Sequence, residues 1–264
     1  MSLLVFIPMY NCAPQIPRVV AQFDNPAVKP WVDAIVCIDN RSTDGTVEAA
    51  AAALADAPVP TRVILQNDEN YGLGGSHKVA IEFAMANDYD HLVVLHGDDQ
   101  GSITDLVPML EAGAHEDVDF LLGARFLPGS QLENYSTVRT LANHLFNWIF
   151  SAVSGRRLHD LGSGLNLFGV DRFADGFHRR FADDLTFNYY LILALAARNE
   201  RLAFFPLTWR EEDQVSNARL GRMGLKMLAL LGRRLADRRG FFQAEHRERP
   251  RASYPATEFS RWSG

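Results

Sequence analysis

Short apolar runs alternate with longer amphipathic segments over the first 125 residues of the chain. A short apolar run bounded by turn residues predicts a buried strand, and a longer segment with one apolar face predicts a helix. Repeated strand–helix units of this length predict an α/β fold with a Rossmann-like, doubly wound and mostly parallel sheet. The expected strands are Leu3–Ile7, Ala34–Asp39, Arg62–Gln66, Leu92–Leu95 and Val118–Ala124, and the expected helices lie near Pro14–Phe23, Thr46–Ala55, Ser76–Ala86 and Ile103–Ala112.

The pattern changes after Arg125, where the apolar segments become longer and more aromatic. We expect helices over Leu141–Val153 and Thr186–Ala197, and strands over Leu165–Val170 and Leu202–Leu207. No linker interrupts the chain, so residues 1–239 are expected to form one domain: a first half (1–125), an appended zone (126–215) and a helix (216–239). Residues 240–264 are polar and contain proline, which predicts a flexible tail.

Composition narrows the class of protein. The chain of 264 residues is 47% hydrophobic and 22% charged, as in globular domains, and no apolar run approaches the length of a membrane span. The N-terminal residues read as a strand rather than a signal peptide. Cys12 and Cys37 have no metal-binding spacing, so we expect them to be buried thiols of a cytoplasmic protein.

Polar residues follow each expected strand, at Asn11, Asp39, Asn67 and Asp98. Ligands bind beyond the carboxyl ends of parallel strands, so these residues predict one site. The richest turn, His96-Gly97-Asp98-Asp99-Gln100, carries ligands that suit Mg²⁺ or Mn²⁺ bridging to phosphates. The plain alternative is an acidic loop that caps the next helix.

Three further turns are compatible with a nucleotide ligand. Tyr10 offers a flat face for a base, and the Asp39 carboxylate can accept hydrogen bonds from a base or ribose. The glycine-rich stretch from Asn70 to Lys78 allows close approach of a backbone to an anion, with the Lys78 ammonium as added positive charge. Each turn also has a purely structural explanation, and the glycine-rich stretch matches neither a Walker A loop nor a Rossmann fingerprint.

The order of these motifs resembles the family 2 glycosyltransferases of the GT-A fold. The motifs are Ile7-Pro8-Met9-Tyr10-Asn11, Asp39-Asn40-Arg41-Ser42-Thr43-Asp44-Gly45-Thr46, Asn70-Tyr71-Gly72-Leu73-Gly74-Gly75, Gly97-Asp98-Asp99-Gln100, Gly123-Ala124-Arg125, Asp160-Leu161-Gly162-Ser163-Gly164 and Trp209-Arg210…Ser216-Asn217. Within that family the chain looks most like the polyprenyl-phosphate glycosyltransferases, the dolichol-phosphate mannose synthase group. The resemblance covers roughly residues 3 to 230.

The resemblance implies an inverting transfer of a sugar from a GDP- or UDP-sugar to a polyprenyl (dolichyl or undecaprenyl) phosphate. It implies a donor site made of Pro8, Tyr10, Asn11, Asp39, Arg41, Gly75, Lys78, Gly97 and Asp98, and an acceptor site made of Arg125, Arg139, Ser163 and Arg210. Asp98 and Gln100 match ligands of a divalent metal that neutralises the departing diphosphate. Asp98, Arg125 and Asp184 are the candidate catalytic residues.

Three departures from the family pattern affect this interpretation. His96 stands where the first metal-binding Asp belongs, which favours Mn²⁺ over Mg²⁺ if the imidazole is a ligand. Asn166 and Asn217 replace two cations, which weakens the case for a lipid-phosphate acceptor. A soluble sugar, glycan or small-molecule acceptor, a metal-free enzyme and a non-catalytic nucleotide-sugar-binding protein therefore remain open.

A phosphate acceptor is already an anion and needs no general base, whereas a hydroxyl acceptor does. Asp183 and Asp184 are the best candidates for a base, although capping of the following helix also explains Asp184.

The net charge of −6 hides a basic stretch, because residues 219–251 hold ten Lys or Arg and three Asp or Glu. Arg219, Arg222, Lys226 and Arg233 fall on one face of an amphipathic helix, which suits peripheral contact with an anionic membrane or packing on the core. We therefore expect a cytoplasmic protein, with the cytoplasmic face of a membrane as the alternative location if the helix contacts lipid. The basic stretch is short and lacks interleaved aromatic residues, so nucleic acid is not an expected partner.

Overall fold

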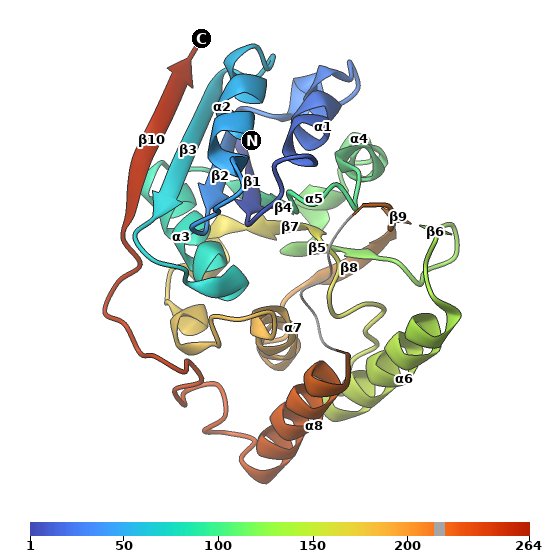
Figure 1. Cartoon of the computed structure of the whole chain (residues 1–264). Coiled ribbons are helices and arrows are strands. Elements are labelled where there is room, and N and C mark those ends of the chain that lie inside the picture. The colour runs from blue at the N-terminus through green and yellow to red at the C-terminus, as the bar shows by residue number, and fades with distance from the viewer. Residues whose placement is uncertain (214–219) are drawn as a thin grey trace.

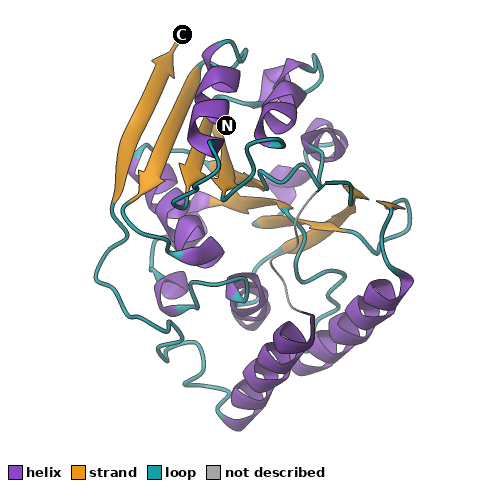
Figure 2. Cartoon of the chain, in the orientation of Figure 1, coloured by secondary structure: helices purple, strands orange, loops and turns teal. Residues whose placement is uncertain are grey.

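The computed structural model describes residues 1–213 and 220–264. An eight-stranded sheet runs through it in the order β10-β3-β2-β1-β4-β7-β5-β8 (Figures 1 and 2). Six strands are parallel, whereas β7 lies antiparallel between β4 and β5, and β10 lies antiparallel on β3. The strands are β1 (Leu3–Met9), β2 (Ala34–Asp39), β3 (Thr61–Asn67), β4 (His91–Leu95), β5 (Phe120–Ala124), β7 (Leu165–Gly169), β8 (Leu202–Pro206) and β10 (Ala256–Ser263).

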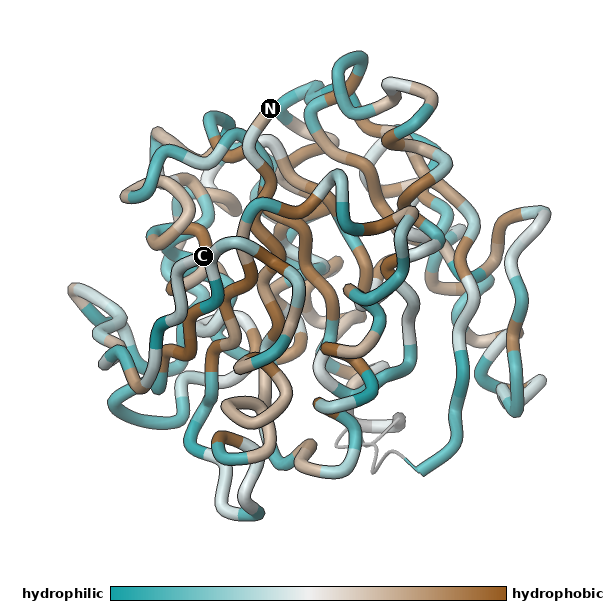
Figure 3. Tube along the Cα trace, turned by 90° about the horizontal axis from the view of Figure 1, so that it is seen from above, coloured by the Kyte–Doolittle hydropathy of each residue, from teal (hydrophilic) through white to brown (hydrophobic). Residues whose placement is uncertain are grey.

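The central strands are apolar on both faces because helices cover both sides of the sheet. In β1, Leu3 and Val5 enter one core while Leu4 and Phe6 enter the other. Figure 3 shows hydrophobic segments, in brown, in the interior of the molecule and mainly hydrophilic loops, in teal, around them. The first core is covered by α1 (Ile16–Ala21), α2 (Thr46–Ala55) and α4 (Val107–Glu111), and the second by α3 (Gly72–Ala86) and α7 (Phe187–Ala197).

Two longer helices, α6 (Thr137–Ser154) and α8 (Leu220–Ala236), pack against each other at the far side of α7 (Figure 1). Phe150 of α6 and Leu230 of α8 join the core that α7 covers. The remaining elements are short: α5 (Ala114–Asp117), the paired strands β6 (Gln131–Glu133) and β9 (Thr208–Arg210), and 3₁₀ turns at Gln22–Asp24, Lys29–Trp31, Ile103–Leu106, Val170–Phe173 and Phe177–Arg180.

The expected α/β fold with a mostly parallel sheet is confirmed. The expected flexible tail is not what the structure shows. Within residues 240–264, Phe241 and Tyr254 are buried and Ala256–Ser263 forms β10 along the edge of the sheet. The polar composition suggested a tail because β10 is an edge strand, which exposes one face and one backbone edge to solvent and so can be rich in polar residues. Residues 216–219 of the expected helix, with Ser216, Asn217 and Arg219, lie outside the described residues.

Candidate functional site

The carboxyl ends of β1, β2, β3 and β4 meet at one edge of the sheet. The Gly97 amide after β4 donates to the Pro8 carbonyl in β1 at 3.2 Å, and the Asn40 amide after β2 donates to the Met9 carbonyl at 2.9 Å. The Asn40 side-chain oxygen accepts a hydrogen bond from Asn67 at the end of β3, at 3.0 Å. The turns expected to bind a donor are therefore brought together.

Asp39 organises the turn after β2. Its buried carboxylate accepts hydrogen bonds from the amides of Arg41 and Ser42 and from the Gln66 side chain. Arg41 has a positive φ of 68°, a conformation that these bonds help to hold, and its side chain is exposed. Asp39 thus has the structural role in the turn that was the alternative to ligand binding, and a contact with a nucleotide stays a prediction.

Pro8, Tyr10 and Asn11 lie at the end of β1, beside this turn. The Tyr10 side chain is exposed, as a stacking platform requires. Asn11, with a positive φ of 50°, accepts a hydrogen bond from the Thr43 amide at 2.9 Å, and its own amide donates to the Ser42 hydroxyl. Hydrogen bonds therefore join the turn after β1 to the turn after β2.

The glycine-rich stretch is the first turn of α3 rather than a free loop, since α3 begins at Gly72. A Cβ atom on Gly72 would lie 2.5 Å from the Asp183 carbonyl, and the Gly75 amide donates to that same carbonyl. These glycines therefore let the chain approach the loop before α7. The Lys78 side chain is 0% exposed and bonds to Asp183 and Tyr254, so it does not face the strand ends as expected for a donor contact.

Asp98 occupies the turn directly after β4 and is mostly buried. Burial raises the pKa of Asp98 to about 6, and the neighbouring Asp99 carboxylate adds to this effect. Among the side chains that the structure describes, no Lys or Arg forms an ion pair with it. Asp99 instead pairs with Arg18 at 2.7 Å. Within the described part of the chain, the Asp98 carboxylate is thus a mostly buried charge without an ion-pair partner.

His96 does not join Asp98. Its ring lies against Gly164, where a Cβ atom would come within 2.9 Å of Nδ1, and near the His77 ring. Burial and the Arg125 guanidinium lower the pKa of His96 to about 4, so the imidazole is neutral. Within the described part of the chain no three His, Cys, Asp or Glu side chains are arranged to hold a metal ion.

The donor set therefore fits a metal ion only in part. Asp98 fits as one carboxylate ligand with the Gln100 amide two residues away, whereas the ring of the expected third ligand, His96, packs against Gly164 and near His77. Asp98 and Gln100 are the residues that would hold a divalent metal ion, which would neutralise negative charge on a phosphorylated ligand.

Arg125 and Asp160 form a buried ion pair at the end of β5. The guanidinium binds the carboxylate at 2.7 and 2.8 Å, and the Arg125 amide donates to the same group at 3.0 Å. The Asp160 carboxylate keeps the guanidinium charged, which raises the pKa of Arg125 although burial opposes this. Ser163, also buried, bonds to Asn166 at 3.1 Å. Arg125 and Ser163 are thus committed to partners within the protein.

Two other arginines of the expected acceptor site are more accessible. Arg139 of α6 binds both carboxylate oxygens of Glu211 and is partly exposed. Arg210 of β9 is partly exposed, and its amide donates to the Gln100 carbonyl at 2.9 Å. That bond joins the expected acceptor side to the turn that carries Asp98.

Both candidate bases are held by ammonium groups. Asp183 binds Lys78 at 2.6 Å, and Asp184 binds Lys226 of α8 at 2.5 Å. Asp184 also caps α7 through Thr186. Although burial opposes the change, the Lys226 ammonium and Thr186 lower the pKa of Asp184, which makes it a weaker proton acceptor. The structure therefore favours the capping interpretation of Asp184.

Asp160, Glu211 and Tyr254 were missed as partners of the expected site residues. Asp160 opens a motif that was recognised, so its carboxylate could have been assigned to Arg125. Glu211 directly follows Arg210 but gives no signal of its pairing with Arg139, because that contact depends on tertiary structure. Tyr254 was overlooked because its segment was taken for a tail.

Comparison with solved structures places the fold in the GT-A class. Glucosyl-3-phosphoglycerate synthase from Mycobacterium tuberculosis, solved with Mn²⁺, UDP-glucose and phosphoglyceric acid, superposes with a TM-score of 0.63 at 18% identity, over 89% of this chain and 80% of that one. At this identity the match establishes the fold alone. The same synthase has also been solved with Mg²⁺ and UDP.

The family follows from the sequence match. The model described as glycosyl transferase family 2 covers residues 4–185, and the chain belongs to that family. Polyprenol monophosphomannose synthase from Mycolicibacterium smegmatis is 28% identical over 62% of this chain, and the match spans only 60% of that relative. Undecaprenyl-phosphate mannosyltransferase from Micrococcus luteus is 25% identical over 81% of this chain and 85% of the relative. The protein is therefore a glycosyltransferase.

Proposed function

We propose that the protein transfers a sugar, with inversion, from a nucleoside-diphosphate sugar to a polyprenyl phosphate. The observation that carries the proposal is Asp98, a mostly buried carboxylate that has no ion-pair partner among the described side chains, at the point where four strand ends meet. A divalent cation shared with the donor pyrophosphate would supply a countercharge and stabilise the leaving diphosphate. Pro8, Tyr10, Asn11, Asp39, Arg41, Gly75 and Gly97 line or support the donor side.

The acceptor class rests on two arguments. The names of both curated relatives refer to polyprenol or undecaprenyl phosphate. In addition, Asp183 and Asp184 are engaged by Lys78 and Lys226, so neither is a ready base for a hydroxyl acceptor. A phosphate oxygen attacks without losing a proton. We assign Arg139 and Arg210 to contact with the acceptor phosphate, and Arg125 and Ser163 to positioning of the surrounding loops.

A polyprenyl acceptor requires access to a membrane, and α6 and α8 carry an apolar surface suited to it. In α6, Val138, Leu141, Leu145 and Trp148 are exposed at helical spacing, with Val138 75% and Trp148 68% accessible. In α8, Leu225 is 70% exposed, and Leu228 and Leu235 follow on the same face. Met227, Leu230 and Leu231 pack on the core instead, so α8 combines core packing with an exposed apolar face.

The charge on these helices fits an anionic lipid surface as the occupant. Neither α6 nor α8 contains an Asp or Glu, although the chain as a whole is acidic, and the last turn of α8 carries Arg233 and Arg234. Aromatic and cationic side chains around an apolar stripe favour the lipid–water interface. None of the helices in the described residues has the length and hydropathy to cross a membrane. We therefore propose peripheral contact through the α6–α8 face.

The test is to incubate the full chain with GDP- or UDP-sugars, Mg²⁺ or Mn²⁺, and undecaprenyl or dolichyl phosphate in detergent. We expect metal-dependent release of the nucleoside diphosphate and a lipid-linked sugar whose anomeric configuration, read by NMR, is inverted. Phosphoglyceric acid and simple sugars serve as competing acceptors. Transfer only to a water-soluble acceptor would refute the lipid acceptor, and nucleotide-sugar binding without any turnover would refute the enzymatic proposal.

A further inference from the structure

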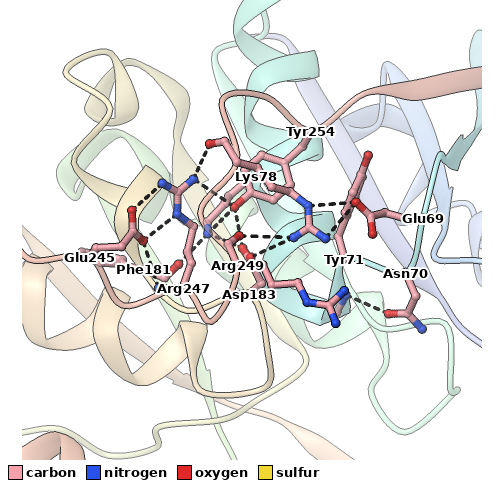
Figure 4. Close-up of polar contacts among 12 residues, drawn as sticks. Glu69, Asn70, Tyr71, Lys78, Phe181, Asp183, Glu245, Arg247, Arg249 and Tyr254 are labelled. Carbon is pink, nitrogen blue, oxygen red and sulfur yellow. Dashed lines mark hydrogen bonds and ion pairs between the residues drawn. The ribbon is translucent and has the colours of Figure 1, made fainter.

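The segment Glu245–Pro255, here called the C-terminal clasp, lies beyond the residues that match the family model. It leads into β10 and passes over the glycine-rich turn Asn70–Gly75 at the start of α3 (Figure 4). Tyr254 of the clasp is only 6% exposed. A polar segment that buries a tyrosine against a turn of the expected donor site calls for a functional explanation.

A buried cluster joins three distant segments beneath the clasp. The Lys78 ammonium donates to the Asp183 carboxylate and the Phe181 carbonyl, both at 2.6 Å, and to the Tyr254 hydroxyl at 3.1 Å. The Tyr254 hydroxyl in turn donates to Asp183 at 2.7 Å. Figure 4 shows these side chains pointing toward one another. All three ammonium protons have acceptors, as a buried charge requires.

Residues of the C-terminal clasp at the edge of this cluster also contact the glycine-rich turn and Glu69 just before it. Arg251 binds Glu69 at 2.9 Å and lies over the Tyr71 ring at 5.0 Å. The Tyr71 and Tyr254 rings meet edge to face at 5.3 Å, and the Tyr71 hydroxyl donates to the Pro255 carbonyl at 2.9 Å. Every one of these contacts comes from the C-terminal clasp.

The other side of the same turn faces the expected donor site. The Tyr71 amide donates to the Asn40 side-chain oxygen at 2.8 Å, and Asn40 donates to Asn70 at 2.8 Å. Asn40 follows Asp39 in the turn after β2. The glycine-rich turn is therefore held between the end of β2 and the C-terminal clasp, and its amides are fixed relative to the strand ends.

We propose that the C-terminal clasp positions the glycine-rich turn for binding of the donor's nucleoside diphosphate, with Tyr254 as the positioning residue. The inference rests on the proposed function, because it assigns the diphosphate of that donor as the ligand. Tyr254 suits the role since one hydroxyl both accepts from Lys78 and donates to Asp183. Phenylalanine would keep the ring packing and lose both bonds.

The test compares full-length Tyr254→Phe and Arg251→Ala with a matched control, Tyr190→Phe. Tyr190 is also buried and stacks on Phe241 of the C-terminal region, but its ring packs there rather than on the glycine-rich turn. Calorimetric titration with UDP and with GDP, each with Mn²⁺, gives the affinity, and hydrogen exchange reports on residues 70–75. Arg251→Ala removes the contacts with Glu69 and Tyr71 and a longer ion pair with Asp183 at 3.7 Å, but it leaves the hydrogen bonds among Lys78, Asp183 and Tyr254 in place.

We expect both clasp variants to bind the diphosphate about 5- to 10-fold more weakly, with faster exchange at residues 70–75 and kcat at saturating donor within about twofold. The control should match the wild-type chain. Unchanged affinity in the clasp variants, or an equal loss in the control, would overturn the inference. If the wild-type chain binds neither UDP nor GDP, the proposed function fails. In that case hydrogen exchange still tests the positioning role, and unchanged exchange at residues 70–75 in Tyr254→Phe would overturn it.

Discussion

At the scale of single residues, the main contrast is between carboxylates with and without a partner. Asp160, Asp183 and Asp184 each bind a cation within the chain, whereas Asp98 is mostly buried and binds none among the side chains that the structure describes. An unpaired buried charge costs free energy in the ligand-free protein, and functional sites are where such costs concentrate. Substitution of Asp98 is therefore expected to change the stability of the protein and its activity in opposite directions.

Asp98→Asn is expected to remove activity while stabilising the ligand-free protein. The folded-state pKa of about 6 exceeds the usual value of 3.8, so above pH 6 the charged carboxylate destabilises the fold by about 2–3 kcal/mol, which the amide avoids. Loss of charge at the metal position should lower kcat by at least about 100-fold. Urea unfolding at pH 7.5 and the transfer assay check both effects. A less stable variant would mean that Asp98 already has a countercharge.

Asp160→Asn is expected to have the opposite effect on stability. The change leaves the buried Arg125 guanidinium without its countercharge and should cost about 3–5 kcal/mol of unfolding free energy. Asp175→Asn is the control, because its ion pair with Arg198 is largely exposed and should be worth less than about 1 kcal/mol. Equal losses in urea unfolding of the two variants would contradict the importance given to burial.

At the scale of elements, the sequence predicted those whose burial is uniform. β2 and β4 are apolar along nearly their whole length because helices cover both faces of the sheet there, so their apolar runs were recognisable, and α2 was predicted with its observed bounds. β10 was missed because its exposed face is polar and its pairing with β3 joins residues far apart in the chain. The same limit applies to the site: the strand ends were predicted, whereas the orientation of His96 depends on Gly164, in a loop that packs there only in the folded chain.

The α6–α8 face gives a prediction for two whole elements. Leu141→Ser and Trp148→Ser should each weaken binding to vesicles that contain phosphatidylglycerol by about 3- to 10-fold, because each removes apolar surface from the lipid contact. Leu185→Ser is the control, since Leu185 is exposed but lies outside both helices. Co-sedimentation at low and high salt provides the measurement. Binding that is unaffected by either α6 change would exclude this face as the docking surface.

At the scale of the whole molecule, the fold buries titratable groups whose ordinary pKa values lie near neutrality. Burial lowers the pKa of both His77 and His178 to about 3, and the nearby Lys78 ammonium adds to the effect in each case. Neither ring nitrogen of His178 has a hydrogen-bond partner among the residues that the structure describes. These histidines are neutral in the folded state and take up protons readily only after unfolding. Asp98 acts in the opposite direction, because its raised pKa makes the folded state the better proton acceptor between about pH 6 and 3.8.

Acid sensitivity follows from this linkage, and His178→Phe isolates one contribution. Because the unfolded imidazole titrates near 6.5 and the folded one near 3, stability from neutral His178 is complete above pH 6.5 and is lost as the pH falls toward 3. At pH 5 the loss is about 2 kcal/mol relative to neutral pH.

Urea unfolding at pH 7.5 and pH 5 should show His178→Phe losing about 2 kcal/mol less than wild type, because phenylalanine does not titrate and fits the surrounding aromatic cluster of Phe173 and Phe177. His144→Gln, which replaces an exposed imidazole on α6, is the control. An unchanged pH dependence in His178→Phe would show that this imidazole accepts a proton inside the folded protein.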